Sequence, residues 1–449
     1  MKKEGYYLNN FFCYLKNNRI NFTVMNNYEG YPDFIPSDID IAIDPKTFTK
    51  LDVLIFDFAS NEQLNIVQKI WHGFQKCAYI LCPAIMNSRF RLQLDFFVDF
   101  TAKGYLKLIT STEMISTSYS YKNFHIPSPP VELVFLITRR IIKNDANPDK
   151  ISEIQQIINT NSDVLSEVKD IFGDNMREIV DSFVDQQHPN ELKSNNPVFS
   201  SRLKQFAKNR SNIKYRITYR LSELKRLISR IRFPVGISVS LLSPDGGGKS
   251  TALKLVAPII SGAFHGSSQY YWRPGLLPPM GRLKFWNPSP EIDSNPTPHD
   301  HPSQNPIKSF FRFCYYSLDF IFGYYVKIKP QIIKKKIVYF DRYYFDFFVD
   351  LHRYKMSIPK FLPKLISILI PKPDVNIVLS CDPQIMLERK QELSATEISR
   401  QCDMYLELAK RNKSFHVVDA SNDPKTIAKE ISSIIISEKT KITKKSLNN

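Results

Sequence analysis

Residues 237–256 read ISVSLLSPDGGGKSTALKLV, and this stretch decides how the C-terminal half of the chain folds. It begins with a β-branched apolar run that predicts a buried strand, continues through three consecutive glycines, and ends in an amphipathic pattern typical of a helix. Glycines let successive backbone N–H groups point into one concavity, and the N-terminus of the following helix adds its positive dipole end. The order strand, glycine loop and helix therefore predicts a phosphate-binding loop.

The residues of this loop carry separate predicted roles. Lys249 supplies a mobile charge for the β- and γ-phosphates of ATP, and Ser250 supplies a hydroxyl ligand for Mg²⁺. We expect Lys249 to be exposed when no nucleotide is bound. Ser243 stands where the pattern G-x-x-x-x-G-K-[ST] has its first glycine, so the alternative is a glycine-rich turn before an ordinary helix. The residues expected to bind the nucleotide are Asp245, Gly246, Gly247, Gly248, Lys249, Ser250 and Thr251.

A second informative stretch, KIVYFDRYYFDFFVD, spans residues 336–350. It predicts a strand that delivers Asp341 and Arg342 at its C-terminal end. Ligands of open α/β sheets bind at that edge, so we expect Asp341 to face the Mg²⁺ beside the loop. The alternative is an acid and a base that only close a strand.

SPDGGGKST and the DRY at residues 341–343 resemble the xDGxGK[ST]T and DR[YF] motifs of thymidylate kinases, and the resemblance covers about residues 235–437 in matching order. It implies a P-loop domain like that of nucleoside monophosphate kinases, with a parallel sheet flanked by helices, ATP and Mg²⁺ as cofactors, and a mobile lid over about residues 388–400. Arg389 and Arg400 of the lid would meet the transition-state charge, because the loop carries no arginine. Asp245 is placed where the family has an acid near a sugar hydroxyl of the acceptor.

The segment 269–326 departs from this family, because it is long and rich in aromatic residues and proline. We expect Trp272 and Arg273 to hold the acceptor, since rings pack on sugars and guanidinium groups pair with phosphate. The family's S-x-x-A-Y-Q pattern after DRY is also replaced here, by YFDFFVDLHRY. We therefore expect a kinase whose acceptor contains a sugar, such as a glycan or a precursor in polysaccharide synthesis. One alternative is a nucleoside monophosphate held by Arg273 and Arg342; another is a catalytically decayed nucleotide-binding or membrane-scaffolding protein.

In the N-terminal third, PSDIDIAID at residues 36–44 places Asp38 and Asp40 two positions apart, so that on a strand they share a face. A second candidate strand at residues 91–100 adds Asp95, and the three carboxylates predict a divalent-cation site. This pattern resembles the nucleotidyltransferase fold, an α+β fold. The Gly-Ser pair with which that family grips a triphosphate is missing, so a second, nucleotidyltransferase activity stays open, as does the alternative of surface acids on a strand edge.

The chain has 449 residues, a net charge of +17 and six scattered cysteines. The length predicts two or three domains, and the charge favours polyanionic partners, with an anionic membrane surface as one and no specific nucleic acid expected. The cysteine spacing indicates neither disulfides nor zinc. We find no signal peptide and no long uncharged apolar run, so we expect a cytoplasmic protein, at most peripheral at the inner face of the membrane. The oligomeric state is left open, a dimer included.

The expected domain order is a nucleotidyltransferase-like domain at 1–127, a helical appendage at 128–187 that packs on it, a linker with a basic helix at 188–234, the kinase domain at 235–437 and a disordered basic tail at 438–449. In the basic helix, apolar residues recur three and four positions apart and form one stripe. The stripe is made of Ile213, Ile217, Leu221, Leu224, Ile228 and Ile231. It is expected either to dock on a domain or to lie on an anionic membrane.

Overall fold

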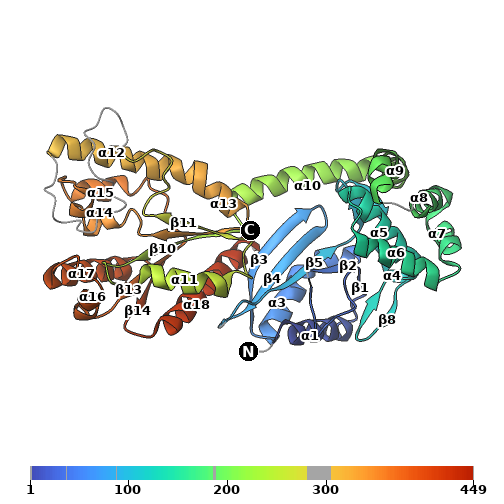
Figure 1. The fold of residues 1–449 in the computed structure, drawn as a ribbon, viewed down its shortest axis with the longest axis horizontal. Helices are drawn as coiled ribbons and strands as arrows, with labels where there is room; N and C mark the ends of the chain where they lie inside the picture. Colours follow the sequence, from blue (N-terminus) through green and yellow to red (C-terminus); the bar gives the residue numbers. More distant parts are fainter. Residues whose placement is uncertain (1–2, 37, 87, 186–188, 281–304, 448–449) are drawn as a thin grey trace. The chain divides into compact units, whose positions relative to one another are not determined.

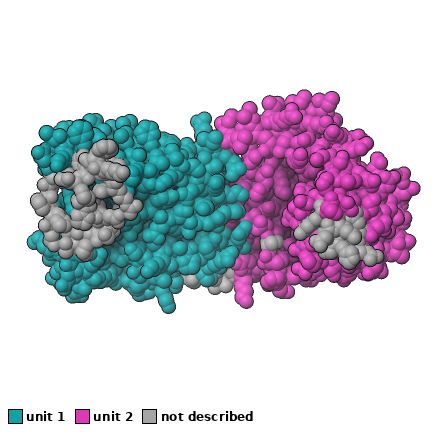
Figure 2. Space-filling view, turned by 45° about the horizontal axis from the view of Figure 1, so that its top comes forward, with its two compact units in different colours: residues 1, 82–91, 230–449 teal, residues 2–81, 92–229 magenta. Residues whose placement is uncertain are grey.

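The computed structural model describes residues 3–36, 38–86, 88–185, 189–280 and 305–447. The chain divides into two compact units (Figure 2): unit 1 contains residues 1, 82–91 and 230–449, and unit 2 contains residues 2–81 and 92–229. The segment 82–91 belongs to unit 1 because it packs closely there. A Cβ atom on Gly262 would lie 2.2 Å from the carbonyl oxygen of Phe90, so only glycine allows this approach.

Over its described residues, unit 1 contains a five-stranded sheet in the order β11-β12-β10-β13-β14, and all its strands are parallel (Figure 1). The strands are β10 (Ile237–Leu242), β11 (Ser267–Tyr271), β12 (Ile337–Asp341), β13 (Val375–Ser380) and β14 (Phe415–Asp419). Strand β10 leads into the glycine loop and is buried along its whole length between β12 and β13. The parallel sheet flanked by helices is confirmed, and it is compatible with a P-loop kinase-like fold.

The helices of unit 1 connect these strands and cover the sheet. They are α11 (Lys249–Ile260), α12 (Pro306–Gly323), the π-helical turn η3 (Tyr324–Ile328), α13 (Lys329–Ile333), α14 (Asp346–Val349), the 3₁₀ turn η4 (His352–Tyr354), α15 (Phe361–Ile366), α16 (Pro383–Arg389), α17 (Ala395–Arg411) and α18 (Pro424–Leu447). An aromatic core joins α12 to the region after β12, with Trp272 packed on Phe320, Phe347 and Tyr354.

The expectation of a disordered tail at 438–449 is wrong for its described part, because α18 continues to Leu447. The inner face of this helix is apolar as far as Ile435 and Ile436 and then continues with polar residues at the same spacing. Lys439 is only 2% exposed, and burial lowers the pKa of its amine to about 8. A polar composition suggests disorder here, but the buried lysine and threonines recur at helical spacing and continue the inner face of α18. Composition alone does not detect that spacing.

Unit 2 contains a mixed sheet in the order β1-β2-β5-β4-β3. Its strands are β1 (Phe22–Val24), β2 (Ile39–Ile43), β3 (Leu64–Gly73), β4 (Lys76–Pro83) and β5 (Leu92–Phe97), and two hairpins follow as β6 (Phe100–Ala102) with β7 (Leu106–Ile109) and β8 (Tyr119–Tyr121) with β9 (Phe124–Ile126). Strand β2 runs parallel to β5 and antiparallel to β1, while β4 is antiparallel to β5. The described helices of this part are α1 (Glu4–Asn17), α2 (Pro45–Thr49), α3 (Leu51–Asn61) and α4 (Ser111–Ser116).

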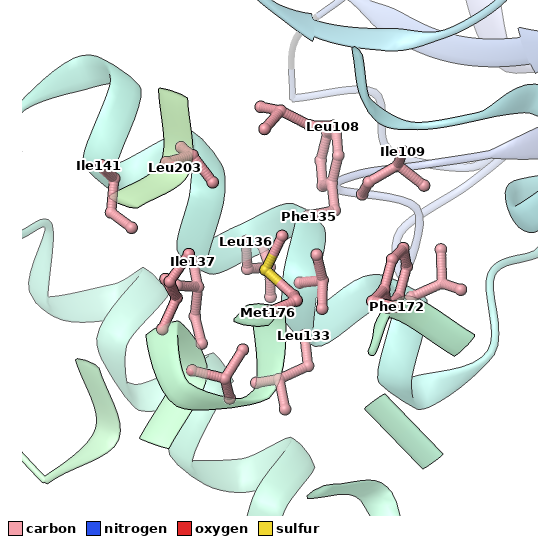
Figure 3. Packing of buried hydrophobic residues seen from close by; sticks show 14 of the residues in the cluster. Leu108, Ile109, Leu133, Phe135, Leu136, Ile137, Ile141, Phe172, Met176 and Leu203 are labelled. Carbon is pink, nitrogen blue, oxygen red and sulfur yellow. The ribbon is translucent and has the colours of Figure 1, made fainter. Parts of the chain in front are cut away.

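A bundle of helices completes unit 2 and shares one core with the preceding strands (Figure 3). The bundle comprises α5 (Pro129–Lys143), α6 (Pro148–Thr160), α7 (Val164–Phe172), α8 (Asp174–Val184) and α9 (Pro189–Arg210). Leu133 and Phe135 of α5 belong to the same buried cluster as Leu108 of β7 and Met176 of α8. The packing of the helical appendage on the N-terminal domain is therefore confirmed.

The segment predicted as a linker followed by a basic helix is helical over most of residues 189–234. Helix α9 begins at Pro189 and includes Pro197, and it is anchored by Leu203 and Phe206, which join the core of unit 2. The next helix, α10 (Ile213–Arg232), confirms the predicted basic helix, but no residue of it is buried, so its apolar stripe does not dock on a domain. In the part of the chain that the structure describes, every helix is too short or too polar to cross a bilayer.

Candidate active site

The loop between β10 and α11 depends on glycine at three successive positions. Gly246 (φ 82°) and Gly248 (φ 83°) adopt left-handed conformations that residues with side chains rarely reach. Gly247 is required by packing, because a Cβ atom there would lie 1.6 Å from Ser243 Oγ and 2.8 Å from Ser243 Cβ. Rotation of the hydroxyl alone would not relieve that clash. The serine that replaces the first glycine of the pattern is thus accommodated by a glycine inside the loop.

Lys249 is held by the loop itself. Its Nζ donates hydrogen bonds to the carbonyl oxygens of Ser243 and Pro244, both at 2.9 Å. The expectation of an exposed lysine is wrong: only 7% of Lys249 is accessible, because its ammonium group folds back into the concavity of the loop. Burial, with a smaller contribution from Arg342, lowers the pKa of this amine to about 7. A phosphate that enters the loop would replace the neutral carbonyl oxygens as hydrogen-bond acceptors of Lys249 Nζ. Its negative charge would favour the protonated form of the amine.

Asp341 and Ser250 meet beside the loop, as expected. Ser250 Oγ donates to Asp341 Oδ2 at 3.3 Å, and Asp341 is the last residue of β12. Its Oδ1 is buried and has no hydrogen-bond partner among the described residues. A buried carboxylate oxygen left in this way requires an explanation, and a hard cation provides one. The two side chains therefore fit a Mg²⁺ ion, with the remaining ligands coming from water and nucleotide phosphates.

Arg342 follows Asp341 in a strained conformation, with φ at 75°. Strain of this kind in a bulky residue persists only where the surroundings enforce it, and it concentrates at functional sites. Its side chain donates from Nη1 to Asp346 Oδ2 at 2.9 Å and from Nη2 to Asp245 Oδ1 at 2.6 Å. Burial is the largest single influence and disfavours the charged guanidinium, but the Asp346 carboxylate and nearby tyrosines together outweigh it and raise the pKa of Arg342 well above its ordinary value.

The sequence interpretation missed a second arginine at this point. Arg353 also donates from Nη2 to Asp245, so two guanidinium groups converge on one carboxylate of the phosphate loop. Asp346 is fixed in turn by the hydroxyls of Tyr354 and Tyr405, at 3.1 Å and 2.9 Å. The sequence YFDFFVDLHRY contained a sign of this cluster, because Asp346, Asp350 and Arg353 interrupt its apolar run. They recur at helical spacing from Arg342, which predicts that they lie on one face.

Arg389, from the predicted lid, lies at the edge of a cavity of about 160 Å³ beside the start of α11. Its Nη1 donates to the carbonyl oxygen of Ala420 at 3.1 Å. The cavity is lined by Gly247, Gly248, Thr251, Ala252, Leu379, Arg389, Ala420, Asn422, Pro424 and Ile427. A mostly apolar pocket that opens onto the glycine loop suits a flat heterocycle whose phosphates lie on the loop.

Arg400, the other lid arginine, is not directed at the phosphate loop. It lies on α17, where it pairs with Glu397 at 2.6 Å and donates to the carbonyl oxygen of Val349 at 2.9 Å. The guanidinium group of Arg400 therefore has hydrogen-bond partners on α17 and at Val349. A phosphate contact from Arg400 would require α17 to move.

The two residues expected to hold the acceptor are structural. Trp272 is 2% exposed and forms the centre of the aromatic core described above, so its ring is not available for stacking on a sugar. Arg273 donates from Nη1 to Asp319 at 2.9 Å and to the carbonyl oxygen of Leu277 at 2.7 Å. Asp319 is fully buried, and its charge requires this arginine. Much of the lobe at 269–326 lies outside the described residues.

Asp40 lies on β2 and Asp95 on β5, where the two are opposite each other in register, whereas Asp38 lies just before β2 begins at Ile39. Asp40 pairs with Arg139 at 3.2 Å, and Asp95 accepts from Gln93 at 2.8 Å. Burial, with further contributions from Asp40 and Asp38, raises the pKa of Asp95 to about 6. Within the described ranges, no group of three Asp, Glu, His or Cys side chains is arranged to hold a metal ion. The expected three-carboxylate site is therefore not formed in the described structure, where Arg139 pairs with one oxygen of Asp40 and Gln93 donates to one oxygen of Asp95.

No protein-family model matches this chain. Over 210 residues, which are 44% of this chain and 95% of the relative, it is 24% identical to a protein of Pyrobaculum aerophilum described as a probable thymidylate kinase. This distant similarity supports a thymidylate kinase-like region, in agreement with the parallel sheet and glycine loop of unit 1. The nucleotidyltransferase-like nature of the N-terminal domain stays a prediction.

Proposed function

We propose that this chain is an ATP- and Mg²⁺-dependent phosphotransferase with its active site in unit 1. The observation that carries the proposal is the grouping of Lys249, Ser250 and Asp341 around a glycine loop, where Asp341 keeps a buried oxygen without a partner among the described residues. The thymidylate kinase-like relative supports the same kinase-like chemistry. A decayed nucleotide-binding protein would not need to retain a buried carboxylate oxygen without a hydrogen-bond partner at this point.

The donor nucleotide would be held from three directions. The N-terminus of α11 and the loop amides bind the phosphates, and Lys249 contributes a positive charge. The cavity beside Arg389 takes the base. Ser250 and Asp341 would hold Mg²⁺, and the ion would supply positive charge against the charge that develops during transfer.

The acceptor side is defined by Arg342 and Arg353, whose guanidinium groups point at the carboxylate of Asp245. Two guanidinium groups that converge in this way suit an anion. The phosphate of an acceptor would accept the same charge-assisted hydrogen bonds as the Asp245 carboxylate does here. This favours an acceptor that already carries phosphate, such as a nucleoside monophosphate. The sugar-containing acceptor stays a prediction, but Trp272, one of the rings expected to pack on it, lies in the core. The pairing of Arg273 with Asp319 removes one of the two arginines that were expected to hold a nucleoside monophosphate, and Arg353 takes that place in the proposal.

The test is transfer of labelled γ-phosphate from ATP by the purified full chain, with nucleoside monophosphates, sugar phosphates, free sugars and oligosaccharides as acceptors. We expect Mg²⁺-dependent transfer to a phosphorylated acceptor. Transfer to unphosphorylated sugars alone would show that the arginine pair does not select the acceptor. Hydrolysis and transfer both at the level of a Lys249→Met control would overturn the proposed function.

A further inference from the structure

Helix α10 presents its apolar stripe outward. Every residue of the stripe is at least half exposed, from 54% for Ile217 and Ile231 to 74% for Ile213. Leu227, at 50% exposed, extends the same face. Single exposed apolar residues are ordinary, but a continuous row along 20 residues of helix, about 30 Å, indicates an interaction surface.

The opposite face of α10 holds the helix to unit 2, so the orientation of the stripe is fixed. Tyr215 packs edge-on against Phe74 with ring centroids 5.7 Å apart, and Tyr219 packs against Tyr105 at 5.8 Å. Tyr219 also lies so close to Gly104 that a Cβ atom at that glycine would clash with its ring. The ring contacts of α10 with unit 2 are made by these tyrosines, while the isoleucines and leucines of the stripe stay exposed.

Basic residues border the stripe on both sides. With 3.6 residues per turn, Lys214, Lys225 and Arg232 lie along one side of it and Arg216 and Arg220 along the other. The helix carries seven lysines and arginines and a single acid, Glu223, which is paired with Arg226 at 2.5 Å. An apolar row between two cationic rows matches a partner surface that has an apolar interior and anionic groups at its boundary with water.

We propose that α10 docks on an anionic lipid bilayer, with the stripe in the acyl boundary and the basic rows among the headgroups. A second copy of the chain suits this face poorly, because pairing two stripes would bring cationic rows of the same sign together. The membrane proposal does not depend on the proposed phosphotransferase function; if both hold, phosphate transfer takes place at a membrane surface.

The test is flotation of the full chain with vesicles of phosphatidylcholine alone and with vesicles in which phosphatidylglycerol replaces about one third of that lipid. We expect binding to the anionic vesicles only, and its loss at high salt. The double variant Leu221→Glu, Leu224→Glu should reduce binding by about tenfold or more, because apolar burial is replaced by two anions. Arg220→Glu with Lys225→Glu should have a similar effect through charge alone.

The matched control uses α12, which also exposes apolar side chains. Phe311 and Phe322 are 59% and 57% exposed, so Phe311→Glu with Phe322→Glu changes an equally accessible face and should leave vesicle binding unchanged. Equal binding to neutral vesicles, retention of the wild-type chain in the unbound fraction, or undiminished binding by the Leu221→Glu, Leu224→Glu variant would overturn the proposal. So would a wild-type dimer that this variant converts to a monomer.

Discussion

Asp341 in unit 1 and Asp40 in unit 2 both lie on parallel strands of a sheet, and the sequence suggested a divalent cation for each. Their surroundings differ. Asp341 has one hydroxyl neighbour and keeps an oxygen without a partner among the described residues, whereas Asp40 is paired with Arg139. A carboxylate can act as a metal ligand only where its neighbours leave lone pairs available. The comparison therefore supports the proposal that phosphate transfer takes place in unit 1.

The largest expected effect contrasts the two units directly. Lys249→Met and Asp341→Asn should each lower phosphate transfer from ATP by about 10²-fold or more, because each removes charge stabilisation of the transferring phosphoryl group. Asp38→Asn and Asp40→Asn should leave the rate unchanged. The measurement is initial velocity with labelled ATP, and thermal unfolding of each variant checks that the fold is intact. Loss of transfer in the Asp40→Asn variant would break the comparison.

Arg353 sharpens the assignment of the acceptor side. Arg353→Ala should reduce kcat/KM for a phosphorylated acceptor by about 10- to 100-fold, because a charge-assisted hydrogen bond contributes about 1.5–3 kcal/mol. The affinity for ATP should not change. Steady-state kinetics with the acceptor varied provide the measurement, and Arg411→Ala, which removes an exposed arginine on α17, is the matched control. A defect confined to KM for ATP would contradict the assignment.

A smaller effect is expected for stability in unit 2. The pKa of Asp95 is raised to about 6, so between about pH 4 and 6 the folded state binds more protons than the unfolded state, and stability falls as pH rises through this window. Asp95→Asn removes that penalty and should stabilise unit 2 by about 1 kcal/mol at pH 7 and by nothing at about pH 3. Hydrogen exchange of the β5 amides reports this region alone. Destabilisation at pH 7 would show that the carboxylate is favourably bound.

The smallest expected effect is in metal binding by unit 2. In a chain carrying Asp341→Asn, titration with Mn²⁺ should detect no tight site, and adding Asp40→Asn should change nothing. Isothermal calorimetry provides the measurement. A site that disappears with Asp40→Asn would restore the three-carboxylate prediction and show that Arg139 is displaced by the cation.

Much of unit 1 could be predicted from the sequence, because strand, glycine loop and helix are local patterns with separate physical requirements. The meeting of Ser250 with Asp341 was also predictable, since both follow parallel strands that end at the same edge. The roles of Trp272 and Arg273 were not. Whether an aromatic ring faces a ligand or a core depends on side chains more than forty residues away, such as Phe320 and Asp319.

Arg139 and Arg353 were missed for the same reason. Their carboxylate partners, Asp40 and Asp245, lie about a hundred positions distant in the chain, and nothing in the local pattern connects them. The buried face of α18 was missed because its last turns are polar in composition. In each case the sequence pattern identified the element and its position in the order of strands and helices, while the partner of the side chain depended on tertiary packing.

The contact between Ser243 and Gly247 also restricts the order in which this loop can change. With Ser243 present, any side chain at position 247 collides with it, so Gly247 cannot be substituted first. With glycine at 243 that collision disappears, and the contact that remains for an alanine Cβ at 247 is a tight one of 3.3 Å with the carbonyl oxygen of Pro244; a later return to serine at 243 would then collide with the alanine. The two positions are thus epistatic, and a lineage that fixes a side chain at 247 loses access to the sequence seen here.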